Sequence, residues 1–197
     1  MDLSRTAVVF IGFQNDYFAG DGILKGAIEE SVKTNSVLEH SLDLVDELIE
    51  RDVLLIQTPI VFTEDYKELV NPVGILKVIK DVGAFKEGTR GGAVIDEFKA
   101  YGEKILTVPG KRGLNAFSNT DLEERLQQHQ IEHVVVAGAV TSICIDSTGR
   151  AAHERGYRVS ILADCTAGRS NVEQSFYCEN IFPLYASVLT SEELLAD

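Results

Sequence analysis

Two residues of this 197-residue chain have the chemistry of a nucleophilic site, a cysteine at the expected start of a helix and a lysine after another strand. Cys144 follows a short apolar run at 134–137 and Gly138, and a helical pattern begins at about Ser142. Backbone N–H groups and the positive end of a helix dipole favour a thiolate at that position. Cys144 is therefore a candidate nucleophile. A small buried hydrophobic side chain is the alternative of equal weight.

Lys111 follows the third predicted strand, at 103–108. Open parallel sheets bind ligands at the carboxyl ends of their strands, so we expect three loops to converge there. They are the loop after Phe13, the loop that carries Lys111, and the turn that leads to Cys144. A cation beside the cysteine would stabilise its thiolate further. On spacing alone, an ordinary surface lysine is the favoured alternative.

The elements that must position these residues alternate along the chain. Strands are predicted at 7–13, 53–59, 103–108, 134–137, 157–163 and, at an edge, 187–189. Helices are predicted at about 30–51, 120–129, from 142, at 172–182 and from 190, with short helical patterns near 74–80 and 94–99. This alternation predicts a three-layer α/β/α fold with a mainly parallel sheet of about six strands. We expect one domain over 1–197, with a long excursion between 60 and 101 that carries function.

Composition argues against several classes of function. The chain has 18 basic and 31 acidic side chains and a net charge of −13, which disfavours nucleic acid and anionic membranes as partners. No apolar stretch approaches the length of a membrane span, and the first apolar run lacks a cationic flank, so a cytoplasmic protein is expected. Cys144, Cys165 and Cys178 form no CxxC pair and are expected to be free thiols.

Four short motifs flank the predicted loops and carry a family resemblance. They are GAVTSICI at 138–145, QNDY at 14–17, Lys111 with NAF at 115–117, and DCTA at 164–167. In that order they resemble the G-x-x-T-x-x-C-V nucleophile motif, the end of the D-x-Q-N-D-F motif, the K…x-A-F segment and the D-x-x-A motif of the isochorismatase-like cysteine hydrolases. That family includes nicotinamidases, carbamoylsarcosine amidases and ureidoacrylate-type amidases. The resemblance covers nearly the whole chain and implies the Rossmann-like fold of that family.

The resemblance also implies a role for each site residue. Cys144 would be the nucleophile and Lys111 the cation beside it. A non-proline cis peptide would precede the threonine, at Val140-Thr141, and turn backbone N–H groups, including that of Cys144, toward a developing oxyanion. Thr141 would help to hold this turn. The family aspartate that accepts the cysteine proton and returns it to the leaving amine falls at Gly12, so the expected triad is incomplete.

Two carboxylates lie near these motifs, but neither is expected to replace the missing aspartate. Asp16 belongs to QNDY, a motif in which the family carries an aspartate in addition to the catalytic one, so a loop-ordering role is favoured. Asp146 follows Cys144 by two residues on the same helix. It lies about 200° around that helix, because each residue turns ~100°.

Further predictions concern the pocket, metals and partners. Pocket candidates, for which surface or core roles are the commoner alternative, are Phe13, Asp16, Phe18, Arg90, Phe117 and Tyr177. The nicotinamidase branch binds a metal through an aspartate and histidines after the second strand, where this chain reads QTPIVFTEDYKEL. We therefore predict no metal and no other cofactor, and disfavour nicotinamide as substrate. The histidines are scattered without ligand spacing, at His40, His129, His133 and His153. The resemblance implies a homo-oligomer, a dimer or a tetramer.

Three functional hypotheses stay open. The favoured one is a cysteine hydrolase that cleaves a small amide, ureide or related C–N substrate through a Cys144 acyl-enzyme. Without its general acid–base group it would be ~10²- to 10⁴-fold slower. The second is a pseudo-hydrolase that binds a small carbonyl or acid ligand, or a partner protein, without turnover. In the third, Gly12 is an engineered substitution that traps a complex.

Overall fold

The computed structural model describes residues 2–196, in which six strands form one sheet. The strands are β1 Thr6–Ile11, β2 Leu54–Thr58, β3 Leu106–Thr107, β4 His133–Ala139, β5 Arg158–Ala167 and β6 Ser187–Leu189. Their order is β3-β2-β1-β4-β5-β6, and all neighbouring pairs are parallel. β1 and β4 are central and buried along their whole length, as their near-continuous apolar runs predict. The predicted parallel sheet is confirmed.

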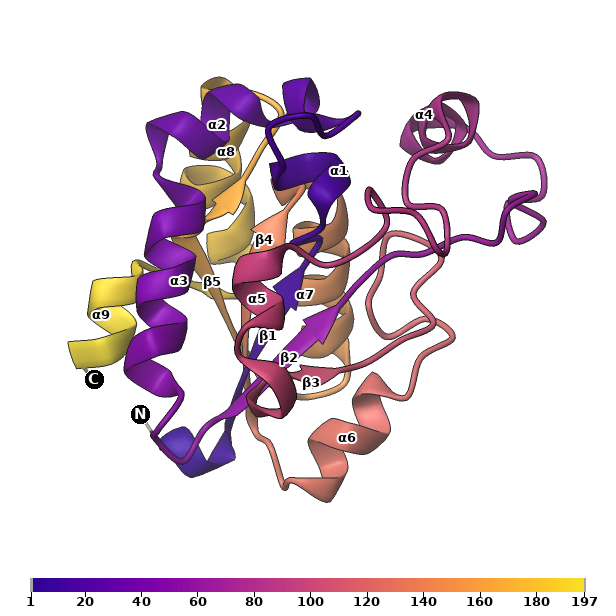
Figure 1. Cartoon of the computed structure of the whole chain (residues 1–197). Helices are drawn as coiled ribbons and strands as arrows, with labels where there is room; N and C mark the ends of the chain where they lie inside the picture. The colour runs from indigo at the N-terminus through magenta and orange to yellow at the C-terminus, as the bar shows by residue number, and fades with distance from the viewer. Residues whose placement is uncertain (1, 197) are drawn as a thin grey trace.

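Helices cover both faces of this sheet and give three layers (Figure 1). The α-helices are α1 Asn15–Phe18, α2 Glu29–Thr34, α3 Val37–Leu48, α4 Gly74–Val82, α5 Asp96–Lys99, α6 Leu122–Gln128, α7 Asp146–Glu154, α8 Asn171–Phe176 and α9 Ser191–Ala196. On one face α3, α5 and α9 bring Leu44, Phe98 and Leu194 against β1, β4 and β5. On the other face α6 and α7 bring Leu126 and Ala152 against the same strands. Within 2–196 no helix is both long and apolar enough to cross a bilayer.

Short 3₁₀ and π turns extend or separate these helices. The 3₁₀ turns are η1 Leu3–Arg5, η2 Lys25–Ala27, η3 Gly102–Lys104 and η6 Phe182–Leu184, and the π turns are η4 Thr141–Ile145 and η5 Tyr177–Ile181. The helix predicted over 172–182 is therefore α8 followed by η5, with residue 182 opening η6. Residues 103 and 104 belong to η3, so the third strand keeps only two residues.

The single helix predicted over about 30–51 is two helices, α2 and α3. Ser36 separates them with a left-handed backbone, φ 47°. Both Asn35 and Ser36 favour local hydrogen bonds over a helix interior, and Asn35 Nδ2 donates to Ser31 Oγ at 3.3 Å. The apolar spacing continues across the break, so periodicity alone does not reveal it.

The fifth strand is longer than predicted and continues to Ala167 after an irregularity in its pairing with β4. The DCTA motif therefore lies in β5, where we had expected a loop. Asp164 accepts hydrogen bonds at 2.9 Å from the Ser191 amide and at 2.6 Å from its hydroxyl. This carboxylate therefore connects α9 to β5.

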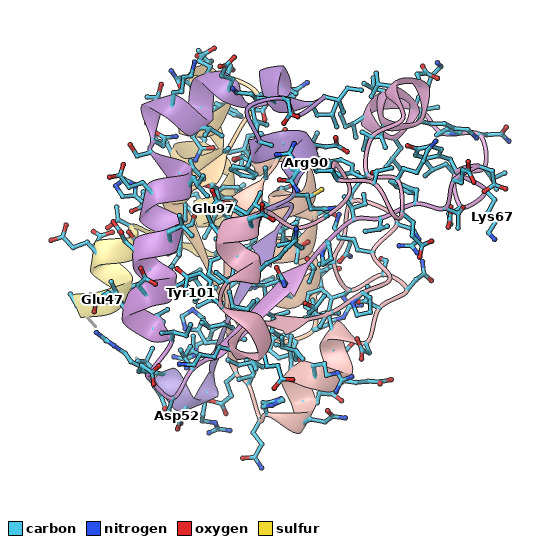
Figure 2. All side chains as sticks on the ribbon, in the orientation of Figure 1. Glu47, Asp52, Lys67, Arg90, Glu97 and Tyr101 are labelled. Atoms are coloured by element: carbon cyan, nitrogen blue, oxygen red, sulfur yellow. The ribbon has the colours of Figure 1, made fainter. Side chains whose placement is uncertain are left out.

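The excursion between β2 and β3 carries α4 and α5, and α4 stands apart from the sheet at the right of Figure 1. Lys67, which precedes α4 in the chain, lies at the outer edge of the excursion (Figure 2). A separate apolar cluster joins the excursion to the strand ends, with Phe62 and Phe85 from the excursion, Tyr17 from α1 and Ala139 from β4. The carboxyl end of the sheet is therefore covered by this segment.

Close approach of β1 and β4 requires the glycine at position 138. Gly138 has φ +119°, and a Cβ atom there would overlap the carbonyl oxygen of Ile11. We expect Gly138→Ala to lower the free energy of unfolding by about 3 kcal/mol or more, because backbone strain and overpacking add. Gly26→Ala is the control, since no atom lies within 4 Å of its Cβ position. Urea unfolding measures both, and equal stability of the two variants would contradict the prediction.

Candidate active site

Cys144 lies in the π turn η4, between the end of β4 and the start of α7. The amides of Ile143 and Ile145 both donate to the carbonyl of Val140, at 3.0 and 3.2 Å. These two hydrogen bonds to one carbonyl fix the turn and hold Cys144 at the carboxyl end of the sheet. The predicted strand, turn and helix are present, with a π turn before the α-helix. Cys144 itself is almost buried, with 9% of its surface exposed.

The non-proline cis peptide bond is Ala139-Val140, one residue before the predicted Val140-Thr141. β4 continues to Ala139 and η4 begins at Thr141, so only Val140 connects the strand to the turn. The family motif predicts a cis peptide bond next to the threonine, but it does not show at which residue the strand ends.

Thr141 anchors the turn through Gln174, a residue of α8 that carries no sequence signal. The Thr141 hydroxyl donates to Gln174 Oε1. Gln174 Nε2 donates in turn to Thr166 Oγ1 of β5 at 2.9 Å. Since all three side chains are buried, each bond satisfies a polar group that water does not reach.

Lys111 lies beside the cysteine, with its Nζ 3.5 Å from Cys144 Sγ. Its side chain has no exposed surface, and Nζ also donates to the carbonyl of Gly113 at 2.6 Å. Fully buried lysines are rare and need partners of this kind. The loops after β3 and β4 therefore do converge, and burial rules out an ordinary surface lysine.

The other two cysteines are poor candidates for the nucleophile. Burial, and to a smaller extent the nearby charge of Glu179, raise the pKa of Cys178 to about 11. Burial, and then the charge of Asp164, raises the pKa of the Cys165 thiol well above its usual range. Both side chains are therefore thiols at neutral pH, and the thiolate is the reactive form. Among the cysteines of the described chain, Cys144 is the one in contact with a lysine amine.

Gly12 lies at the same site, and its backbone suits glycine. Its φ is +76°, and a Cβ atom there would lie 3.0 Å from the carbonyl oxygen of Ala139 and 3.6 Å from the ring of Tyr17. Left-handed backbone is strained for most side chains, although aspartate and asparagine tolerate it better than others. A carboxylate at position 12 would therefore require a strained backbone or a local shift.

The two carboxylates near the motifs, Asp16 and Asp146, are bonded to other groups. Asp16 Oδ2 accepts a hydrogen bond from the amide of Phe85 at 2.6 Å. Asp146 accepts from Arg150 Nε with both oxygens, each at 3.0 Å. Within the described chain, no aspartate or glutamate is among the residues that line the pocket beside Cys144.

That pocket is small, nearly closed and mostly apolar. It is lined by Ile11, Gly12, Tyr17, Ile60, Ile75, Leu76, Ile79, Phe85, Lys111, Leu114, Ala139, Ile143 and Cys144. The cavity is about 10 Å³, which is room for about one water molecule. A larger hollow of about 780 Å³ lies at the amino ends of β4 and β5, beside His133 and Arg158, and includes neither Cys144 nor Lys111. The chemistry therefore belongs to the smaller cavity.

The side chains predicted for the pocket wall lie elsewhere, and the aromatic ones belong to the core. Phe13 stacks on Phe18 with ring centroids 4.8 Å apart, on the face covered by α3 and α5. Phe117 stacks on Tyr157 at 6.3 Å, and Tyr177 packs against Phe182 at 5.6 Å. A loop position near the strand ends does not decide which way a large ring turns, and burial favours the core.

The two charged pocket candidates are also engaged elsewhere. Arg90 is exposed beside α1 and forms an ion pair with Asp21 (Figure 2). Asp16 holds the excursion through Phe85, as described above. A Cβ at Gly91 would collide with the Asp16 carboxylate, so the excursion passes close to α1 only because that residue is glycine. No group of three potential ligands among His, Cys, Asp and Glu comes together in residues 2–196 as a metal site would require.

Gln14 connects the site to the excursion. Its buried amide donates to the carbonyls of Ile60 and Gly92, at 2.8 and 2.7 Å, and accepts from the Ile60 amide at 2.9 Å. Ile60 thus enters the pocket wall beside Tyr17. The QNDY motif marked Gln14 and Tyr17 in the sequence. It does not show which distant residues of the excursion they contact.

Comparisons with known proteins show the family and agree with the fold. The family model of the isochorismatase domain matches residues 6–193. The chain is 35% identical over 85 residues to the isochorismatase family protein YecD of Escherichia coli, a match that covers 43% of this chain and only 45% of that protein. It is 25% identical over 178 residues to the ureidoacrylate amidohydrolase RutB of Methylorubrum extorquens, covering 84% of this chain and 71% of that one. A cysteine hydrolase from Pseudomonas syringae has the same fold, with a TM-score of 0.86 at 20% identity over 100% of this chain and 93% of that one.

Alkylation should distinguish the cysteines. At pH 7 we expect iodoacetamide to label Cys144 at least about tenfold faster than Cys178, because a lysine amine favours the thiolate form. A raised pKa of about 11 means that labelling of Cys178 increases as pH rises from 7 toward 11. Peptide mass spectrometry measures both rates. Lys111→Met should slow labelling at Cys144 alone, and an unchanged rate in that variant would contradict the role of Lys111.

Proposed function

This chain belongs to the isochorismatase family, and from that premise we propose that it is a cysteine-dependent hydrolase of small amides, ureides or related C–N compounds. The 3.5 Å contact between Lys111 Nζ and Cys144 Sγ, buried at the end of the sheet, carries this proposal. The similarity to a ureidoacrylate amidohydrolase supports the class of bond that is cleaved. The proposed nucleophile is the Cys144 thiolate, and the proposed reaction proceeds through an acyl-enzyme.

The reaction needs a group that moves one proton, and Lys111 is the candidate. Its amine takes up the proton of the Cys144 thiol, and the thiolate attacks the substrate carbonyl carbon. A C–S bond forms and the C–N bond breaks while Lys111 returns the proton to the leaving nitrogen. Water then attacks the thioester and releases the acid, and the proton from water restores the thiol. The proposed oxyanion donor is the amide of Cys144, since the amides of Ile143 and Ile145 bond to Val140.

Position 12 determines which leaving groups are cleaved well. No carboxylate of the pocket wall in the described residues can share the proton transfer with Lys111. A strongly basic amine must receive a proton before it can leave, whereas a leaving group of low basicity departs without one. We therefore propose that activated acyl compounds react faster than simple amides.

The absence of a wall carboxylate also supports a second candidate function, a pseudo-hydrolase that binds a small carbonyl or acid ligand without turnover. The two candidates differ in whether a substrate acylates Cys144. Small molecules are the proposed ligands in both cases. A cytoplasmic location, a homo-oligomeric state and the lack of nucleic-acid or membrane partners stay predictions from the sequence.

Acylation of Cys144 tests the proposal. We expect p-nitrophenyl acetate to add an acetyl group to Cys144, visible as a mass increase in intact-protein and peptide mass spectra. Turnover should fall by at least about 10³-fold in Cys144→Ser and by about 10²- to 10⁴-fold in Lys111→Met, because each removes a group that acts on the reacting atoms. An unmodified Cys144 together with ligand binding would favour the pseudo-hydrolase.

Replacement at position 12 tests the missing acid–base group. Gly12→Asp and Gly12→Asn place side chains of the same shape on the same left-handed backbone, so any strain is shared. We expect Gly12→Asp to hydrolyse simple amides about 10²- to 10⁴-fold faster than Gly12→Asn, since only the carboxylate can carry a proton. Steady-state kinetics with one amide panel gives the ratio, and equal rates would show that position 12 does not face the reacting atoms.

A further inference from the structure

We infer that the Cys144 pocket accepts an uncharged, apolar acyl group, so that its substrates are small neutral aliphatic or aromatic acyl compounds and not ions. The part of this inference that concerns turnover rests on the proposed function, whereas the part that concerns binding does not. Apart from Gly12, Lys111 and Cys144, every lining residue is aliphatic or aromatic. Because the cavity is only about 10 Å³, an acyl chain enters it only when the lining side chains move apart. The chain then meets hydrocarbon beyond the reacting carbonyl.

The pocket has one cation, and that cation already has partners. Lys111 Nζ donates to the Gly113 carbonyl and contacts Cys144 Sγ. In the proposed reaction Lys111 and Cys144 share one proton, so the pair has no net charge whichever of the two groups holds it. A substrate carboxylate would add an unpaired negative charge to a nearly closed apolar cavity, which is strongly unfavourable.

Tyr17 adds no charge to the wall. Burial, and then the negative charges of Cys144 and Asp16, raise the pKa of its phenol above the ordinary value. The hydroxyl therefore stays protonated at neutral pH. Asp16 is not a lining residue, and its carboxylate accepts the amide proton of Phe85 at 2.6 Å.

The arginines of the neighbouring loops are also engaged. Arg112 Nε lies 3.5 Å from Glu68 Oε1, and Arg90 forms an exposed pair with Asp21. Neither arginine lines the pocket. Among the described residues, no arginine is thus placed to bind a substrate carboxylate through the bidentate contact that such recognition uses.

Helix α4 gives the wall its apolar character by facing the pocket with one side only. Ile75 and Ile79 are four residues apart and share a helix face, which lines the pocket. The charged residues of α4 point elsewhere, since Lys77 pairs with Asp81 on the exposed side and Lys80 Nζ donates to the carbonyl at residue 69 at 3.4 Å. Helix α4 therefore supplies hydrocarbon to the site and keeps its charged side chains away from the pocket.

A matched pair of esters tests this inference with the full chain. p-Nitrophenyl butyrate and mono-p-nitrophenyl succinate have the same leaving group and acyl chains of similar length, and the second ends in a carboxylate. We expect kcat/KM for the butyrate to exceed that for the succinate by at least about 100-fold. Equal or faster cleavage of the succinate would overturn the inference.

A cation added to the wall should reverse part of this preference. Leu114 lines the pocket with 38% of its surface exposed, so an arginine there can keep its charge hydrated. We expect Leu114→Arg to lower the butyrate-to-succinate ratio by at least about tenfold. Val78→Arg is the control because Val78 is 44% exposed and does not line the pocket, and its ratio should be that of the parent. An equal fall of the ratio in both variants would show a general effect of charge and would contradict the proposed wall.

Binding to a non-acylating variant separates this inference from the proposed reaction. In Cys144→Ser, ligand-observed NMR should detect butyramide with a Kd at least about tenfold below that of succinamate. That result supports the pocket chemistry even if no ester acylates Cys144 in the parent, an outcome that would overturn only the proposed hydrolysis. Tighter binding of succinamate would overturn the inference whatever the rate of turnover.

Discussion

A lysine amine without solvent must find its partners inside the protein, and the carboxyl end of this sheet is arranged to supply them. Lys111 Nζ meets the Gly113 carbonyl at 2.6 Å and Cys144 Sγ at 3.5 Å. The first partner comes from the loop after β3 and the second from the turn after β4. Because an unsatisfied buried amine is costly, the two loops stay together wherever the lysine is buried. The groups to which we assign the chemistry thus also stabilise the junction that holds them.

Much of the fold could be predicted from the sequence because buried strands have a strong pattern. The runs that became β1 and β4 are apolar throughout, and in the structure both faces of each are covered. The break between α2 and α3 was missed, since the apolar spacing continues across the left-handed Ser36. The extension of β5 through Asp164 was missed for another reason. Its carboxylate bonds to Ser191, 27 residues later, and no local pattern reveals that partner.

The proposed reacting residues were easier to predict than the wall around them. Cys144 and Lys111 lie in the segments that follow β4 and β3. Parallel strands bring their carboxyl ends to one edge, so the strand pattern predicted that these segments converge. Spacing alone still favoured a surface position for Lys111, and the family motifs were needed to predict its amine beside Cys144. The wall comes largely from the excursion, which is positioned by Gln14 and by contacts of Tyr17 and Phe85. Large aromatic side chains attracted attention in the sequence, but packing placed most of them in the core. The aliphatic residues of α4 showed a helical pattern in the sequence, but nothing in that pattern indicated that they would line a pocket.

The two ends of the sheet limit how it can meet another strand. β3 pairs through two residues and β6 through three, so each outer edge offers a very short row of unpaired backbone groups. A long exposed edge is a template on which further chains can add and aggregate, and short edge strands are one way in which proteins prevent this. The long, strongly apolar strands β1 and β4 are the segments most prone to such pairing, and both lie at the centre of the sheet. The strand order therefore protects the native protein against edge-to-edge aggregation.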